Sequence, residues 1–83
     1  MDPNVVEARI FSFIANGLLG GNSEGLERGT PLLELGVVDS MGITRLTSFL
    51  ETEFGIRVPV EELSATNFAS IEALARLVSR LSP

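Results

Sequence analysis

Ser40 is the residue of this chain whose type and setting come closest to chemistry. It stands in the stretch GVVDSMGITRL, residues 36–46, between Asp39 and an amphipathic segment that predicts a helix. Ser and Asp are both favoured just before a helix, because their side chains accept backbone N–H groups that have no other partner there. Ser40 therefore either helps to start this helix or carries a chemical function.

Nucleophilic catalysis would require a base beside the Ser40 hydroxyl. A serine hydroxyl is a weak nucleophile until a neighbouring base removes its proton. The chain contains neither His nor Cys, and its six basic residues are all Arg, which stays protonated. Asp39 is better suited to accepting backbone N–H groups at the helix start. We therefore expect the chain not to be an enzyme.

No other cluster of residues predicts a catalytic or metal site. The adjacent acids Glu61 and Glu62 are typical of a solvated helix face. The segment DSMGITRLTSFLE lacks the alternating oxygen ligands of a calcium-binding loop. The glycines Gly17, Gly20 and Gly21 follow no predicted strand and precede no GK[ST] motif, so they do not indicate a phosphate-binding loop. We expect them to end a helix.

Length and charge narrow the classes of function. The chain has 83 residues, which predicts one domain over residues 1–83. Its net charge of −5 argues against binding DNA or RNA. Its apolar residues never form the unbroken run of about 18 that a membrane span requires. The start of the sequence does not resemble a signal peptide, so we expect a cytoplasmic protein that does not contact a membrane.

Apolar residues at helical spacing predict four helical segments. The first starts at Asp2 and Pro3 and ends between Asn16 and Gly20; the second runs from about Ser40 to Phe54 and is closed by Gly55. A short turn is expected near Val60–Leu63, and the last helix starts at Ser70. The fold class is therefore all-α: a small four-helix bundle of three main helices and a short third helix.

The second predicted helix has one core face and one outer face. The core face carries Ile43, Leu46, Leu50 and Phe54. The remaining positions, which should face solvent and partners, are Met41, Thr44, Arg45, Ser48, Glu51 and Thr52.

A long connection precedes this helix, from about Gly20 to Asp39. It is too apolar for a free linker, so we expect an ordered loop packed across the helices. The segment TPLLELG predicts one helical turn, with Thr30 as its cap, Pro31 first and Gly36 as its stop. The apolar residues expected to hold the loop are Leu26, Leu32, Leu33, Leu35, Val37 and Val38.

The stretch LLELGVVDSMGITRLTSFLETEF, residues 32–54, resembles the signature of phosphopantetheine-dependent carrier proteins, and GIRVPVEELSATNFASIEALARLV, residues 55–78, resembles the segment that follows it. This resemblance implies that Ser40 is the attachment point of 4′-phosphopantetheine, transferred from coenzyme A by a separate phosphopantetheinyl transferase with magnesium. The partner enzyme would supply the base and metal that this chain lacks. The arm would then hold cargo as a thioester, and its phosphodiester would lie at the positive end of a helix.

The same resemblance implies a partner-binding face. Asp39 matches the acid of the Asp–Ser pair, Met41 matches the apolar residue that follows it, and Thr44, Arg45 and Ser48 match positions on the recognition helix. Fatty-acid carriers have acids along this face, which Arg45 and its neutral neighbours dilute here. The chain looks more like stand-alone carriers of polyketide or nonribosomal-peptide type specialised biosynthesis.

The partners implied for such a carrier are an adenylating enzyme that loads the arm and downstream enzymes that modify or condense the cargo. A carrier that visits several enzymes is expected to be monomeric. The sequence leaves the cargo open between an aminoacyl and an acyl group. It also leaves two alternatives: a carrier of fatty-acid synthesis, or a helical interaction module in which Ser40 only caps a helix.

Overall fold

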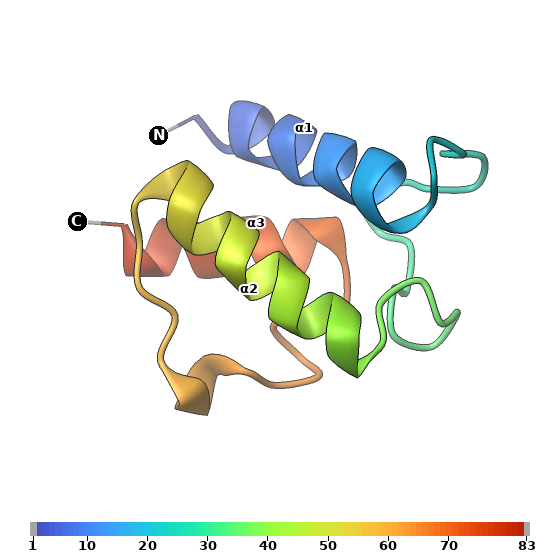
Figure 1. Ribbon diagram of the computed structural model, residues 1–83. Helices are drawn as coiled ribbons and strands as arrows, with labels where there is room; N and C mark the ends of the chain where they lie inside the picture. Colours follow the sequence, from blue (N-terminus) through green and yellow to red (C-terminus); the bar gives the residue numbers. More distant parts are fainter. Residues whose placement is uncertain (1, 83) are drawn as a thin grey trace.

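The computed structural model describes residues 2–82, and these contain three α-helices and no strand: α1 (Pro3–Phe13), α2 (Ser40–Phe54) and α3 (Ile71–Leu81) (Figure 1). A π-helical turn, η1 (Ile14–Leu18), extends α1, and a 3₁₀ turn, η2 (Val60–Glu62), lies between α2 and α3. The all-α class is confirmed. The four-helix bundle is not confirmed, because the short third helix is a single 3₁₀ turn.

Each α-helix starts on a side chain that accepts a backbone N–H group. Asp2 accepts from Asn4 at 2.9 Å, Asp39 accepts from Gly42 at 2.8 Å, and Ser70 accepts from Ala73 at 3.1 Å. Such caps satisfy donors that have no partner inside the helix. The sequence left Asp39 and Ser40 open as the cap of α2, and the structure assigns that role to Asp39.

The C-terminal ends of α1 and α2 differ. Helical structure after α1 stops at Leu18, within the expected interval, but the last turn is π-helical, and the Leu19 N–H donates to the Ile14 carbonyl at 3.0 Å. Helix α2 ends at Gly55, as expected, where φ is 65°. Glycine adopts this left-handed conformation without a steric penalty, so it ends the helix.

The core lies where the three helices meet. Among the described elements, the backbones of α1 and α3 approach each other most closely, while α2 lies across α3 in the foreground of Figure 1. No helix within residues 2–82 is long and apolar enough to cross a membrane. The larger side chains that are fully buried include Ile10, Ile14, Leu32, Leu46, Leu50, Phe68, Ile71, Leu74 and Leu77.

The long loop before α2 is ordered, as expected. Its residues Leu26, Leu32 and Val38 are buried in the core. The Leu32 N–H donates to the Ala69 carbonyl at 2.9 Å, which ties the loop to the segment before α3. Arg28 adds two ion pairs, to Glu7 of α1 at 2.7 Å and to Glu72 of α3 at 3.4 Å. The hydrogen bond from Arg28 lowers the pKa of the Glu7 carboxyl.

Two expectations for this loop were wrong in detail. Leu35 does not pack inward and keeps 64% of its surface exposed. Thr30 does not cap the turn that follows it: its hydroxyl accepts the Glu27 N–H at 2.7 Å and donates to the Gly25 carbonyl at 3.1 Å. The expected turn is present: the Leu35 N–H donates to the Pro31 carbonyl at 3.1 Å, and the Gly36 N–H donates to the Leu33 carbonyl at 3.2 Å.

The connection after α2 is held by a carboxylate that was expected on the outer face. The Glu51 carboxylate accepts the Val58 N–H at 2.9 Å, so this side chain is half-buried and turned toward the loop. Further along, Glu62 pairs with Arg80 of α3 at 3.2 Å, and the Asn67 amide donates to Glu62 at 2.9 Å. The Arg80 hydrogen bond lowers the pKa of Glu62.

Candidate functional site

Ser40 is the first residue of α2, and its side chain is exposed. Among residues 2–82, no hydrogen bond involves its hydroxyl group. Asp39 supplies the helix cap, so the fold does not require the Ser40 hydroxyl for that purpose. The hydroxyl is available to a modifying protein at the surface.

Asp39 and Gly42 fix the position of this serine. Asp39 has an extended backbone, and its carbonyl accepts the Ile43 N–H at 2.8 Å while its carboxylate accepts the Gly42 N–H. Gly42 is buried, and a Cβ there would lie 3.3 Å from Val38 Cγ1 and 3.4 Å from Asp39 Oδ1. The absence of a side chain therefore lets Val38 pack beneath the first turn and keeps the cap in place.

The sequence interpretation missed Gly42. The available signal was its position inside a helix, where glycine is less favourable than alanine by about 1 kcal/mol. A glycine in the first turn beside a candidate site therefore calls for a local steric reason. The close approach of Val38 and Asp39 supplies that reason.

The electrostatics at Ser40 suit a covalently attached phosphate. The amide N–H groups of Ser40 and Met41 have no recorded acceptor in the part of the chain that the structure describes. The first turn of α2 carries no acid beyond the cap. Unpaired amide groups and the positive end of the helix dipole both favour an anion by about 0.3–1 kcal/mol. The residues present thus fit a phosphodiester on the Ser40 oxygen.

The other residues of the expected partner-binding face lie either beside Ser40 or in a hollow further along α2. Met41 lies next to Ser40 and keeps 74% of its surface exposed. Thr44, Arg45 and Ser48 are also exposed, and they line one shallow hollow on α2 of about 430 Å³. The Thr44 hydroxyl donates back to the Ser40 carbonyl at 3.3 Å. The structure therefore groups three of these residues and leaves Met41 beside the serine.

Within α2, the residues of this face are positive or neutral. The Arg45 guanidinium lies 5.9 Å from the centroid of the Phe13 ring, and no acid pairs with it within residues 2–82. The two acids of α2 are both engaged elsewhere: Glu51 accepts the Val58 N–H, and Glu53 pairs with Arg9 of α1. The acid-rich docking face of fatty-acid carriers is therefore absent from the described surface of α2.

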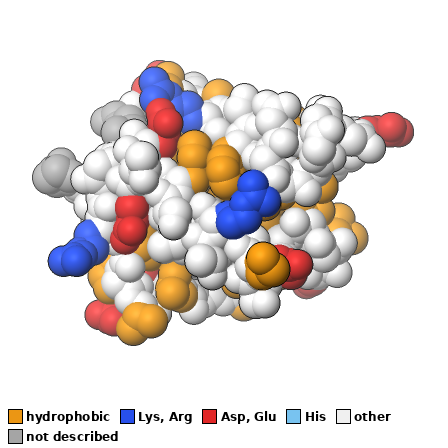
Figure 2. All heavy atoms as spheres, viewed as in Figure 1, with side chains coloured by type: hydrophobic (Ala, Val, Ile, Leu, Met, Phe, Trp, Pro, Cys, Tyr) orange, Lys and Arg blue, Asp and Glu red, His pale blue; other side chains and the backbone are white. Residues whose placement is uncertain are grey.

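The exposure of two apolar side chains outside α2 was not predicted from the sequence. Leu35, in the loop before Ser40, was expected to pack inward, and Val60 of η2 keeps 77% of its surface exposed. Neither has a sequence signal that separates it from its buried apolar neighbours. Figure 2 shows hydrophobic side chains between α1 and α2, flanked by charged ones.

Comparison with known proteins agrees with this geometry. The family described as "Phosphopantetheine attachment site" matches residues 14–78. The chain is 36% identical over 77 residues to the "Probable acyl carrier protein PigG" of Serratia sp. (strain ATCC 39006), a match that covers 93% of this chain and 88% of that protein. It also resembles a chain of a solved structure described as "Crystal structure of FAD-dependent dehydrogenase". That match has a TM-score of 0.79 and 36% identity, and it covers 84% of this chain and 99% of the other.

The family match begins at η1, spans all of α2 and most of α3, and includes Ser40. Members of this family are carriers rather than catalysts, which accords with a chain that has no His, Cys or Lys. Taken with the exposed serine at a capped helix, the comparisons show that the chain belongs to the phosphopantetheine-attachment family of acyl carrier proteins, with covalently bound 4′-phosphopantetheine as its prosthetic group.

Proposed function

We propose that this chain is a discrete acyl or aminoacyl carrier protein whose prosthetic arm is attached to Ser40. One observation carries the proposal: the Ser40 hydroxyl is exposed and free at the start of α2 while Asp39 caps the helix. A serine kept for capping would instead direct its oxygen at a backbone N–H group, as Ser70 does at the start of α3.

Attachment requires Ser40 to present its hydroxyl to a phosphopantetheinyl transferase. The Ser40 oxygen forms a bond to the pantetheine phosphorus of coenzyme A, adenosine 3′,5′-bisphosphate leaves, and the hydroxyl proton passes to a base of the transferase. Asp39 and Gly42 hold the serine in place during this step through the cap. The unpaired amide groups of Ser40 and Met41 stabilise the phosphodiester once it has formed.

The bound arm supplies a thiol, on which cargo is held as a thioester. The loading partner is an adenylating enzyme, and downstream partners modify or condense the cargo. The similarity to a chain described with an FAD-dependent dehydrogenase supports a flavin enzyme among the modifying partners, which would take two electrons and two protons from the tethered group. We propose that the chain acts in polyketide or nonribosomal-peptide type specialised metabolism, as a cytoplasmic monomer.

Partners would dock on the exposed face beside the arm, through Asp39, Met41, Thr44, Arg45 and Ser48. The exposure of Met41, Thr44, Arg45 and Ser48 supports this assignment. A role in fatty-acid synthesis is less well supported, because that role depends on acids along α2, and Glu51 and Glu53 are engaged in contacts within the chain.

The test is the intact mass of the purified chain after incubation with coenzyme A, magnesium and a promiscuous phosphopantetheinyl transferase. We expect one phosphopantetheine adduct on the wild type and none on Ser40→Ala. Ser79→Ala, which removes an exposed hydroxyl on α3, should be modified like the wild type. A folded wild-type chain that stays unmodified beside a modified control carrier would favour the helical interaction module instead.

A further inference from the structure

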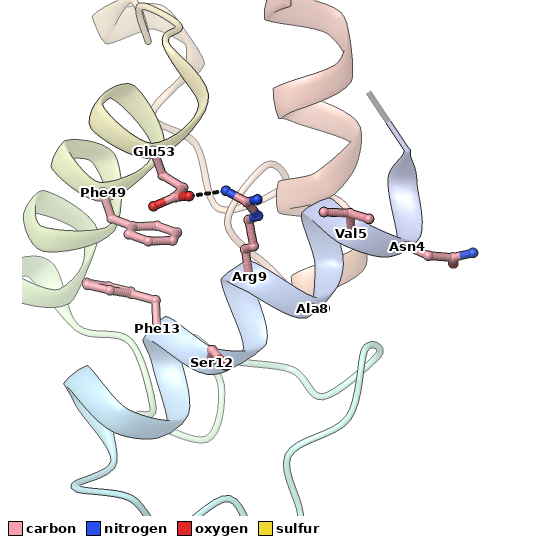
Figure 3. Close-up of a pocket in the computed structure, with 8 residues that line it drawn as sticks. All are labelled: Asn4, Val5, Ala8, Arg9, Ser12, Phe13, Phe49 and Glu53. Atoms are coloured by element: carbon pink, nitrogen blue, oxygen red, sulfur yellow. Dashed lines mark hydrogen bonds and ion pairs between the residues drawn. The ribbon is translucent and has the colours of Figure 1, made fainter.

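Arg45 of α2 is a cation that lacks an anionic partner within the chain. Four of the six arginines form ion pairs with glutamates: Arg9, Arg28, Arg76 and Arg80. Figure 3 shows one of these pairs, between Arg9 of α1 and Glu53 of α2. Among residues 2–82, the Arg45 guanidinium has neither an ion pair nor a hydrogen bond, although its side chain is exposed on the same helix as Glu53.

Helix α1 and the π-helical turn η1 hold this guanidinium from one side. It lies 5.9 Å from the centroid of the Phe13 ring, and Phe13 in turn stacks on Phe49 with centroids 4.3 Å apart (Figure 3). A Cβ at Gly17 of η1 would lie 3.5 Å from Arg45 Nη2 and 3.4 Å from Phe13 Cε1. A side chain longer than that of alanine at Gly17 would therefore meet the guanidinium or the ring. Because Arg45 is already ordered, it loses less conformational entropy when it binds a partner.

The hollow around Arg45, called the Arg45 hollow below, offers hydrogen-bond donors and has no carboxylate in its walls. The residues that line it are Phe13, Thr44, Arg45, Ser48, Phe49 and Thr52. The Ser48 and Thr52 hydroxyl groups have no hydrogen-bond partner in the part of the chain that the structure describes. The planar guanidinium adds donors whose geometry matches the two oxygens of a carboxylate. Ser40 does not line the hollow, so the phosphodiester of the arm is attached outside it.

Apolar surface flanks the guanidinium along α2. Met41, Arg45 and Phe49 recur at every fourth residue, so they lie along one side of the helix. Met41 keeps 74% of its surface exposed, and Phe49 is half-buried. A partner that covers this strip excludes water from the guanidinium, which strengthens a charge pair there. The net charge of −5 repels a strongly acidic surface, so the strip fits a partner that presents a single carboxylate among apolar side chains.

We infer that the Arg45 hollow binds a carboxylate of the adenylating enzyme that loads this chain, and that Gly17 is a positioning residue for the guanidinium. Met41 and Phe49 would contact the apolar side chains around that carboxylate. The inference rests on the proposed function, because it requires an arm on Ser40 that an enzyme loads. It reverses the sign of docking in fatty-acid carriers, since here the carrier supplies the cation and the enzyme supplies the anion.

The distance of the hollow from Ser40 suits the loading enzyme. That enzyme acts on the thiol at the end of the arm, which reaches roughly 17 Å when extended. Thr44 and Ser48, in the wall of the hollow, lie one and two helical turns beyond Ser40, or about 6 and 12 Å along the axis. An enzyme bound at the hollow therefore has the thiol within reach. The transferase acts at the Ser40 oxygen itself, so arm attachment should depend little on Arg45.

The first experiment measures kcat/KM for loading of the arm. The probe is an adenylating enzyme that, with ATP and its acid, charges the wild-type modified chain as judged by intact mass. We expect Arg45→Gln to lower kcat/KM for loading by about 30-fold, as for an arginine at the centre of an interface. Arg57→Gln, at an exposed arginine outside the hollow, should be loaded like the wild type. Equal loading of the Arg45→Gln variant and the wild type would overturn the inference, whereas a wild-type chain that acquires no arm would count against the proposed function.

A cross-link identifies the group that meets position 45. The chain contains no Lys, so Arg45→Lys introduces a unique side-chain amine. A carbodiimide activates a carboxylate, the amine attacks the activated carbonyl, and a urea leaves, so that an amide joins the two proteins. Fragmentation mass spectrometry should place this amide between position 45 and an Asp or Glu of the loading enzyme. A cross-link formed by Arg57→Lys but not by Arg45→Lys would overturn the inference.

Variants at Gly17 test its positioning role while Arg45 is retained. Gly17→Leu should displace the guanidinium and lower kcat/KM for loading, and the yield of the cross-link from Arg45→Lys should fall in the same background. Gly17→Ala, whose Cβ makes only ordinary contacts with Phe13 and Arg45, should retain loading. If Gly17→Leu does not fold, Phe13→Leu removes the ring beneath the guanidinium instead. Wild-type loading by a folded displacing variant would exclude the positioning role of Gly17.

Discussion

Helices α3 and α2 have different roles in this small domain. Six of the eleven residues of α3 are buried, whereas four of the fifteen residues of α2 are buried. Helix α3 also approaches the backbone of α1 closely, while α1 and α2 meet through their Phe rings. The comparison teaches that α3 provides stability and that α2 provides a displayed surface. Substitutions on the two helices should therefore have separable effects.

The largest effect on stability should come from α3. Leu74 is fully buried, and Leu74→Ala should lower the free energy of unfolding by about 2–5 kcal/mol, because it removes apolar contacts and leaves a cavity. Urea denaturation measures the change. The matched substitution on the displayed face of α2, Ser48→Ala, should change stability by less than about 0.5 kcal/mol. Equal losses at the two positions would contradict the division between the helices.

A smaller effect is expected at the start of α2. Asp39→Ala removes the cap and should cost about 1 kcal/mol, whereas Asp39→Asn keeps an accepting oxygen and should cost less. Ser40→Ala should leave the melting temperature nearly unchanged, because the Ser40 hydroxyl makes no bond in the described structure. A destabilisation by Ser40→Ala equal to that by Asp39→Ala would mean that Ser40 is a capping residue.

The helix ends show which features of the fold can be predicted from the sequence. Local side-chain chemistry predicted Asp2, Ser70 and Gly55 correctly, because a cap or a stop depends on neighbouring residues alone. The choice between Asp39 and Ser40 depended on the exact backbone conformation at position 39. The exposure of Leu35 and the inward turn of Glu51 depend on contacts with distant parts of the chain, which a one-dimensional pattern does not contain.

The ion pair between Arg28 of the loop and Glu7 of α1 predicts that the stability of the fold depends on pH. Arg28 lowers the pKa of the Glu7 carboxyl below its ordinary value of 4.5. The stabilisation of the folded state by the Glu7–Arg28 pair is therefore fully present above pH 4.5, and it is lost as the pH falls through the lowered pKa. The difference in melting temperature between the wild type and Glu7→Gln should therefore be larger at pH 7 than at pH 3. Glu24→Gln, at an exposed site with no ion pair among the described residues, should show no such trend. A difference in melting temperature that stays constant with pH would show that the Glu7–Arg28 pair does not stabilise the fold.

The smallest effect on stability, but a clear effect on function, is expected at Met41. This side chain is 74% exposed, so Met41→Ala should leave the melting temperature within about 1 °C of the wild type. We expect the transferase to bury this side chain, so its loss should remove about 2 kcal/mol of contact and lower kcat/KM for arm attachment by roughly 30-fold. An unchanged kcat/KM for arm attachment would show that Met41 does not contribute to binding of the transferase.

The candidate site was predicted in outline from its residues and from the family resemblance. Ser40 and the outer face of α2 followed from one amphipathic pattern and one motif. Gly42 was missed because its role comes from the packing of Val38 under the first turn. The stacking of Phe13 on Phe49 was also missed, since it joins residues 36 positions apart on two different helices, and a helical pattern describes one helix at a time.

The most direct test of the account is to locate the arm within the modified protein. Fragmentation mass spectrometry of the phosphopantetheinylated chain should place one adduct on Ser40, with Thr44 and Ser48 unmodified. The Ser40→Ala variant should unfold at the wild-type temperature and carry no adduct. An arm found on another residue, or one retained by the variant, would contradict the claim that α2 displays Ser40 as a tether point.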